Sequence, residues 1–85
     1  MWYCWYMSPT VFRVGKYRFY FFSREEERSH VHITCPDGEA KFWLEPIVSL
    51  AGYTGLSKRQ LSFLQKIVET REDEIAKAWD KHFEA

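Results

Sequence analysis

The sequence predicts an α+β domain in which a small antiparallel sheet of two hairpins, with four or five strands, packs on a C-terminal helical pair. Two observations predict it. Before residue 55, short runs of apolar residues alternate with polar ones, as in half-buried strands, and from residue 57 the apolar residues recur at helical spacing. A chain of 85 residues suits one domain. We therefore expect residues 9–85 to form a single unit.

Residues 1–8, "MWYCWYMS", are apolar but too short to span a membrane, and no basic segment precedes them. We expect an N-terminal tail or an extended start, and no membrane association. Twelve basic and twelve acidic residues give no net charge, and the two cysteines have neither disulfide-framework nor zinc-site spacing. These features predict a cytoplasmic protein and imply no cofactor.

The segment "TVFRVGKYRFYFF", residues 10–22, predicts a first hairpin that turns at Gly15-Lys16. The expected pairs are Val14 with Tyr17, Phe12 with Phe19 and Thr10 with Phe21, which share one apolar face. On the other face Arg13 lies opposite Arg18, with Val11, Tyr20 and Phe22 beside them. Like charges in this position are unfavourable unless an anion lies between them.

The segment "HVHITCPDGEAKFWLEP", residues 30–46, predicts a second hairpin. Two strands that cover one core must bring their apolar residues to the same side. That condition favours a turn at Asp37-Gly38, with His32 opposite Trp43, His30 opposite Glu45 and Thr34 opposite Lys41. A three-residue Pro-Asp-Gly loop suits the turn residues better but would place Ile33 opposite Lys41. We favour the register that keeps the apolar face intact.

The remaining elements are predicted from turn-forming residues and from the spacing of apolar residues. "SREEERS", residues 23–29, is expected to be a loop, and "EPIVSLAGYTG", residues 45–55, to contain one further short strand. Two helices are expected at about 57–69 and 71–83, the first with a Ser57/Gln60 capping box and the second with Thr70 as its N-cap. The apolar stripe of these helices comprises Leu61, Leu64, Val68, Ile75, Trp79 and Phe83.

The polar face of the second hairpin is the candidate site. Strand alternation places His30 and His32 on one side, about 6.6–7 Å apart along the backbone. They could bind a divalent metal with Glu39 or Glu45, or transfer protons while Lys41, Arg13 and Arg18 hold an RNA phosphate. They could equally be polar strand residues that contact a protein partner. The full set on this face is His30, His32, Thr34, Glu39, Lys41, Trp43 and Glu45.

Exposed aromatic residues among cations give a second hypothesis, because strand-face RNA binders stack bases on aromatic rings. Tyr20, Phe22 and Trp43 alternate with Arg13, Arg18 and Lys41. Two short helices cannot cover both faces of a sheet, so we expect the other face to be open or to meet a partner.

The motifs "PTVFR", "YRFYFFS", "HVHI", "DGEAKFWLEP" and "AWDKHF" resemble a family of very small bacterial and archaeal proteins, domain-of-unknown-function family 4160. The resemblance runs from Pro9 to Phe83. One departure is Arg28-Ser29, where the family usually has prolines before the first histidine. The resemblance emphasises Arg13, Arg18, His30, His32, Glu39, Lys41 and Trp43.

Such a resemblance implies a protein encoded beside a second small protein, in a toxin-antitoxin-like pair. We therefore expect an interaction module whose His/Trp/charged sheet face binds a small protein partner from an adjacent gene, with RNA or DNA as a second ligand. The expected phosphate- or nucleic-acid-binding residues are Arg13, Arg18, Tyr20 and Trp43. The alternative is a ribonuclease-like toxin in which His30 or His32 transfers protons, while an RNA phosphate is held by Arg13, Arg18 and Lys41.

Overall fold

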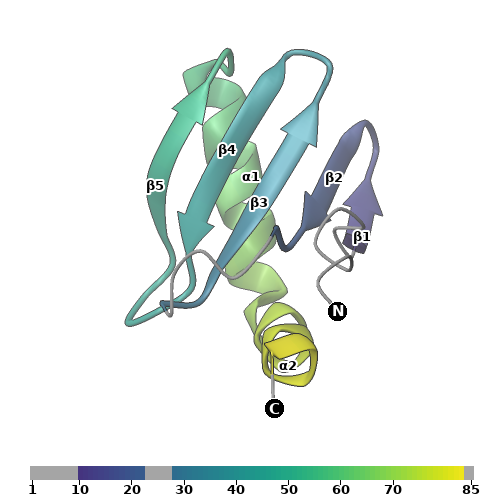
Figure 1. Ribbon diagram of the computed structural model, residues 1–85. Helices are drawn as coiled ribbons and strands as arrows, with labels where there is room; N and C mark the ends of the chain where they lie inside the picture. Colours follow the sequence, from purple (N-terminus) through teal and green to yellow (C-terminus); the bar gives the residue numbers. More distant parts are fainter. Residues whose placement is uncertain (1–9, 23–27, 84–85) are drawn as a thin grey trace.

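The computed structural model describes residues 10–22 and 28–83 and contains a five-stranded sheet followed by two helices. The strands are antiparallel and lie in the order of the chain. Helix α1 lies behind the sheet, and α2 lies past the lower end of the strands (Figure 1). This arrangement confirms the α+β fold predicted from the sequence. The elements are β1 (Thr10–Val14), β2 (Tyr17–Tyr20), β3 (His30–Cys35), β4 (Gly38–Trp43), β5 (Ser49–Thr54), α1 (Lys58–Thr70) and α2 (Glu72–Phe83).

The core lies between one face of the sheet and the helices. Strand alternation sends every second side chain of β2, β3 and β4 towards the helices, and the apolar stripe of α1 and α2 meets them. The predicted stripe is confirmed, with Leu61 and Phe83 at its half-buried margins. The buried side chains include Phe19, Phe21, Val31, Ile33, Phe42 and Leu44 from the sheet and Leu64, Val68, Ile75 and Trp79 from the helices.

The first hairpin turns at Gly15-Lys16 as predicted, and Gly15 has the positive φ of 58° that such a turn requires. Arg13 pairs with Arg18, and the two inner apolar pairs also form. The outermost pair was predicted wrongly, because Thr10 lies opposite Tyr20. A bulge between Thr10 and Phe12 adds one residue to β1 and shifts Thr10 along its partner.

The second hairpin keeps the predicted faces but not the predicted register. His30 lies opposite Trp43 and His32 opposite Lys41, and Thr34 lies opposite Glu39. The turn consists of Pro36-Asp37, because proline has no N–H for the ladder and its fixed φ suits a turn position. The predicted pairs therefore slip by two residues along β4, which leaves each side chain on its expected face.

The helices match the prediction closely. Ser57 caps α1 and forms the predicted capping box with Gln60. Thr70, however, is the last residue of α1 and does not cap α2. The C-cap of α1 is Arg71, whose N–H donates to the Ile67 carbonyl at 2.9 Å. The break between the helices therefore falls at Arg71.

Candidate functional site

The open face of the sheet carries the sequence-predicted site residues in three cross-strand rows. Pairing aligns one residue from each strand, so side chains from distant parts of the chain become neighbours. The Arg18 row comprises Arg13, Arg18, Thr34, Glu39 and Thr54; the His32 row comprises Thr10, Tyr20, His32, Lys41 and Gly52; and the Trp43 row comprises His30, Trp43 and Ser49. These rows contain all of the candidate catalytic and nucleic-acid-binding residues, which are Arg13, Arg18, Tyr20, His30, His32, Lys41 and Trp43. Glu45 lies beyond the end of β4 and does not face His30.

Arg18, Tyr20 and His32 form a continuous stack on the open face. The Arg18 guanidinium carbon lies 4.5 Å from the centre of the Tyr20 ring, and the Tyr20 and His32 rings are stacked with centroids 5.4 Å apart. Arg18 Nε also donates to the Thr10 hydroxyl oxygen at 2.7 Å, a contact that the β1 bulge makes accessible. The guanidinium group is therefore held in a fixed orientation as a flat cationic surface.

Trp43 is a second aromatic platform with two cations beside it. The Lys41 ammonium lies 4.6 Å and the Arg28 guanidinium carbon 4.2 Å from its ring centre. Arg28 Nε donates to the Glu45 carbonyl at 2.9 Å, which fixes the segment before β3 against the segment after β4. Positive charge is thus concentrated around Trp43 in a protein without net charge.

The two histidines have different environments. His30 is 1% exposed and packs against Trp79 of α2, with ring centroids 5.0 Å apart. Its Nδ1 lies 2.8 Å from the Arg28 carbonyl, and since a carbonyl can only accept, Nδ1 carries the hydrogen. His32 is partly exposed. A ligand from solvent can therefore reach His32 and not His30, although strand alternation places both on the same side of the strand.

A shallow hollow of about 400 Å³ lies on the open face beside the Arg18–Tyr20–His32 stack. Its floor reaches Gly52 of β5, where a Cβ atom would have no neighbour within 4 Å. The hollow thus exists because β5 contributes no side chain at this position. Its lining residues are Tyr20, Phe22, His32, Glu39, Ala40, Lys41, Gly52, Tyr53 and Thr54.

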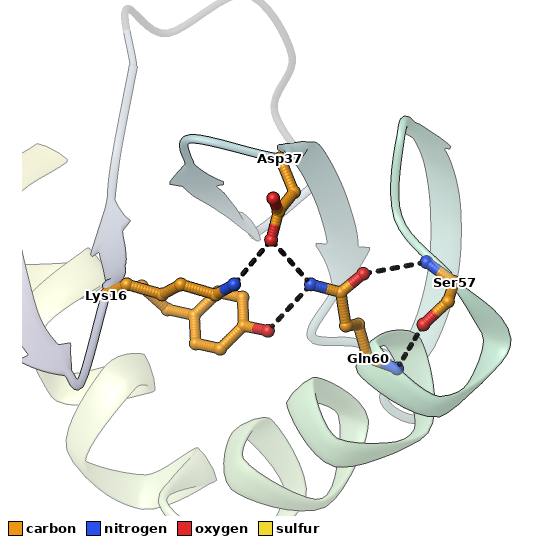
Figure 2. Close-up of polar contacts among 5 residues, drawn as sticks. Lys16, Asp37, Ser57 and Gln60 are labelled. Atoms are coloured by element: carbon orange, nitrogen blue, oxygen red, sulfur yellow. Dashed lines mark hydrogen bonds and ion pairs between the residues drawn. The ribbon is translucent and has the colours of Figure 1, made fainter.

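A polar cluster at the end of the strands that carries the β1–β2 and β3–β4 turns was not predicted from the sequence. Asp37, in the β3–β4 turn, accepts from the Lys16 ammonium in the β1–β2 turn and from Gln60 Nε2 of α1 at 3.0 Å (Figure 2). Gln60 Nε2 also donates to the Tyr17 hydroxyl at 3.1 Å. The cluster joins both hairpin turns to the start of α1. The one part of this cluster that the sequence indicated was the position of Gln60, which the predicted capping box placed at the N-terminus of the first helix.

This cluster shifts two ionisation equilibria. The hydrogen bond from Lys16, followed by that from Gln60, lowers the pKa of Asp37 below its ordinary value of 3.8. The same hydrogen bond from Lys16 to Asp37 raises the pKa of the lysine above 10.5. Both side chains are exposed, so salt screens much of this interaction.

Within residues 10–22 and 28–83, no three histidine, cysteine or acidic side chains gather closely enough to hold a metal ion. Over the same part of the chain, neither helix combines the length and the hydrophobicity that a membrane crossing needs.

The fold and its open face define a class of protein: a small α+β domain with a five-stranded meander, one face covered by a helical pair and the other lined by aromatic and cationic side chains. The chain belongs to the family described as "Domain of unknown function (DUF4160)", whose model matches residues 17–80. That match covers well over half of the chain and confirms the family resemblance seen in the sequence. Neither the comparison with curated proteins nor the comparison with solved structures found a match.

Proposed function

We propose that this protein is a small interaction module of a toxin-antitoxin-like pair, and that its open sheet face binds single-stranded RNA. The observation that carries the proposal is the stack of Arg18, Tyr20 and His32 beside Lys41 and the hollow. Single-stranded RNA is recognised by stacking of bases on aromatic rings or arginine planes and by cations that contact phosphates. The open face offers both kinds of group within two adjacent rows.

The roles of the residues follow from their positions. Tyr20 and the Arg18 plane would stack a base, while Lys41 and Arg13 would contact phosphates on either side of the stack. The hollow above Gly52 has room for a base or ribose beside Lys41. Glu39 limits the positive charge on this face, so we expect moderate affinity.

Binding can be measured by fluorescence anisotropy with a labelled single-stranded RNA of 12 nucleotides. With these two phosphate contacts, the affinity should fall roughly 7-fold between 50 and 200 mM salt. Lys41→Ala should reduce the salt dependence, and Tyr20→Ala should weaken binding by roughly 5- to 150-fold through the lost stacking. Gly52→Leu should also weaken binding, because it fills the hollow without changing the charge.

The matched control is Arg59→Ala, which removes an exposed cation from α1 on the other side of the sheet. It should leave RNA binding unchanged. Equal losses for Arg59→Ala and Lys41→Ala would show that binding is nonspecific and would contradict the proposed face. The proposed complex with a second small protein is tested separately, by co-expression with the product of the adjacent gene followed by size-exclusion chromatography. Separate elution of the two proteins would refute it.

A ribonuclease-like toxin is the second candidate, and the pairing of His32 with Lys41 favours it. His32 would accept the proton of the 2′-hydroxyl as its oxygen bonds to phosphorus, the P–O5′ bond would break, and the leaving 5′-oxygen would take a proton from solvent. The phosphate would be held by Lys41, Arg13 and Arg18. His30 would position the strand through its Arg28 contact. This candidate requires that His32→Gln abolish RNA cleavage by the protein expressed alone; undiminished cleavage would exclude it.

A further inference from the structure

Strand β5 forms an uncharged edge of the sheet. It is the last strand in the sheet order, and its segment "SLAGYT" contains no charged residue or proline. Residues Leu50–Thr54 are all exposed. Natural edge strands are usually protected from pairing by charges or prolines. The opposite edge strand, β1, does carry a charge, at Arg13.

A bulge in β5 places two apolar side chains on the same face. Leu50 lies opposite Phe42 and Tyr53 lies opposite Ala40, and both partners are buried on the helical side. In a regular strand, residues three apart point to opposite faces. The extra residue, Ala51, reverses this relation. Leu50 and Tyr53 therefore share a face, with exposures of 37% and 54%.

We propose that β5 pairs with β5 of a second copy of this chain, antiparallel and about a two-fold axis. The axis passes between Ala51 and Gly52, so that Leu50 of each copy lies opposite Tyr53 of the other. The two-fold arrangement forms this apolar pair twice, and Ser49 likewise lies opposite Thr54. Because of the bulge, paired residues lie on the same face of the joined sheet.

Charge beside β5 is complementary in this arrangement. Glu45 precedes the strand, and Lys58 and Arg59 follow it at the start of α1; all three are exposed. Antiparallel pairing brings the beginning of one β5 beside the end of the other. The antiparallel orientation therefore brings Glu45 of one copy towards Lys58 and Arg59 of its partner, whereas a parallel orientation would bring each of these charges beside its own counterpart.

The interface would be small, since a six-residue strand with a few flanking side chains lies at the lower limit of specific interfaces. Ile47, which is 69% exposed, adds apolar surface beside the strand. We expect a dissociation constant on the order of 10 μM. The open faces of both copies would stay accessible, with their two hollows on the same side of one continuous sheet.

The test is sedimentation equilibrium of the full chain from about 1 to 200 μM, a range that spans the expected dissociation constant. The wild type should change from monomer to dimer. Leu50→Lys should weaken dimerisation by at least 10-fold, because it places an unpaired charge opposite Tyr53. The double variant Leu50→Lys with Tyr53→Glu should restore the dimer, since each lysine then faces a glutamate of the second copy. The matched control is Phe63→Lys, which replaces an exposed aromatic residue on α1 and should leave the dimer intact.

Circular dichroism of each variant separates misfolding from loss of pairing. A wild-type chain that stays monomeric at 200 μM, roughly 20 times the expected dissociation constant, would overturn the proposal. So would a dimer that Leu50→Lys does not weaken, or a folded double variant that stays monomeric. A monomer whose β5 is protected from hydrogen exchange only when the adjacent gene product is bound would assign this edge to that partner and likewise overturn the proposal.

Discussion

Replacing Gly38 with alanine should destabilise the protein severely, because β4 begins against the backbone that follows β5. A Cβ atom at Gly38 would lie 2.0 Å from the Thr54 carbonyl oxygen and 3.0 Å from two backbone atoms of Gly55. Ordinary contacts begin at 3.4 Å, so one segment must retreat by more than about 1 Å. All three obstructing atoms belong to the backbone and cannot rotate away.

The expected cost combines overpacking, about 1–3 kcal/mol, with weakened ladder hydrogen bonds of about 1 kcal/mol each. A total of about 3 kcal/mol corresponds to a fall in Tm of roughly 12–24 °C for a domain of this size. Thermal unfolding followed by circular dichroism measures this directly. The matched control is Gly52→Ala, which meets no atom within 4 Å and should leave Tm unchanged or raise it slightly. A Gly38→Ala variant within about 3 °C of the wild type would refute the close approach.

Three further changes test other parts of the fold. Gly15→Ala should cost about 1 kcal/mol because of the positive φ, and Gly15→Asn less, as urea unfolding would show; equal costs would contradict the turn geometry. Ile75→Ala should lower the free energy of unfolding by about 2–5 kcal/mol, since this side chain of α2 is fully buried in the core. A loss below about 1 kcal/mol in the same assay would argue against that packing. Asp37→Asn should lower stability at neutral pH but not at low pH. The folded-state pKa of Asp37 is depressed, so its contribution is present above the unfolded-state pKa and is lost as the pH falls through the folded-state value. Urea unfolding at several pH values should show the gap closing in acid; a pH-independent gap would exclude a role for the carboxylate.

Residue pattern predicted the faces of the strands better than it predicted which residues pair. The alternation of Val31 and Ile33 with the histidines determined which side chains face the core, because a slip by one residue would bury polar groups. A slip by two carries no such cost. The register then depends on the turn. Pro36 occupies a turn position, and the alternation of apolar and polar residues contains no information about that position. The tight approach of Gly38 to β5 was also invisible in the sequence, because it depends on a third strand.

The face of the sheet that carries the candidate residues could be predicted from the sequence, whereas the accessibility of these residues could not. Period-two alternation correctly placed His30 and His32 on the same side of β3. It could not indicate that Trp79, nearly fifty positions later, packs against His30 at the end of the strand. The stack of Arg18 on Tyr20 and the hollow at Gly52 likewise depend on pairing between hairpins.

The strand order has a consequence for how the chain acquires its structure. Each strand pairs with its neighbour in sequence, so the hairpins close through short loops and can form early. The helical residues that cover the sheet, such as Leu64 and Trp79, come later in the chain. During synthesis, the apolar face of the sheet that the helices later cover therefore stays exposed to solvent until residues 58–83 have been made. Ribosome-bound chains that lack them should be prone to aggregation and should depend on chaperones.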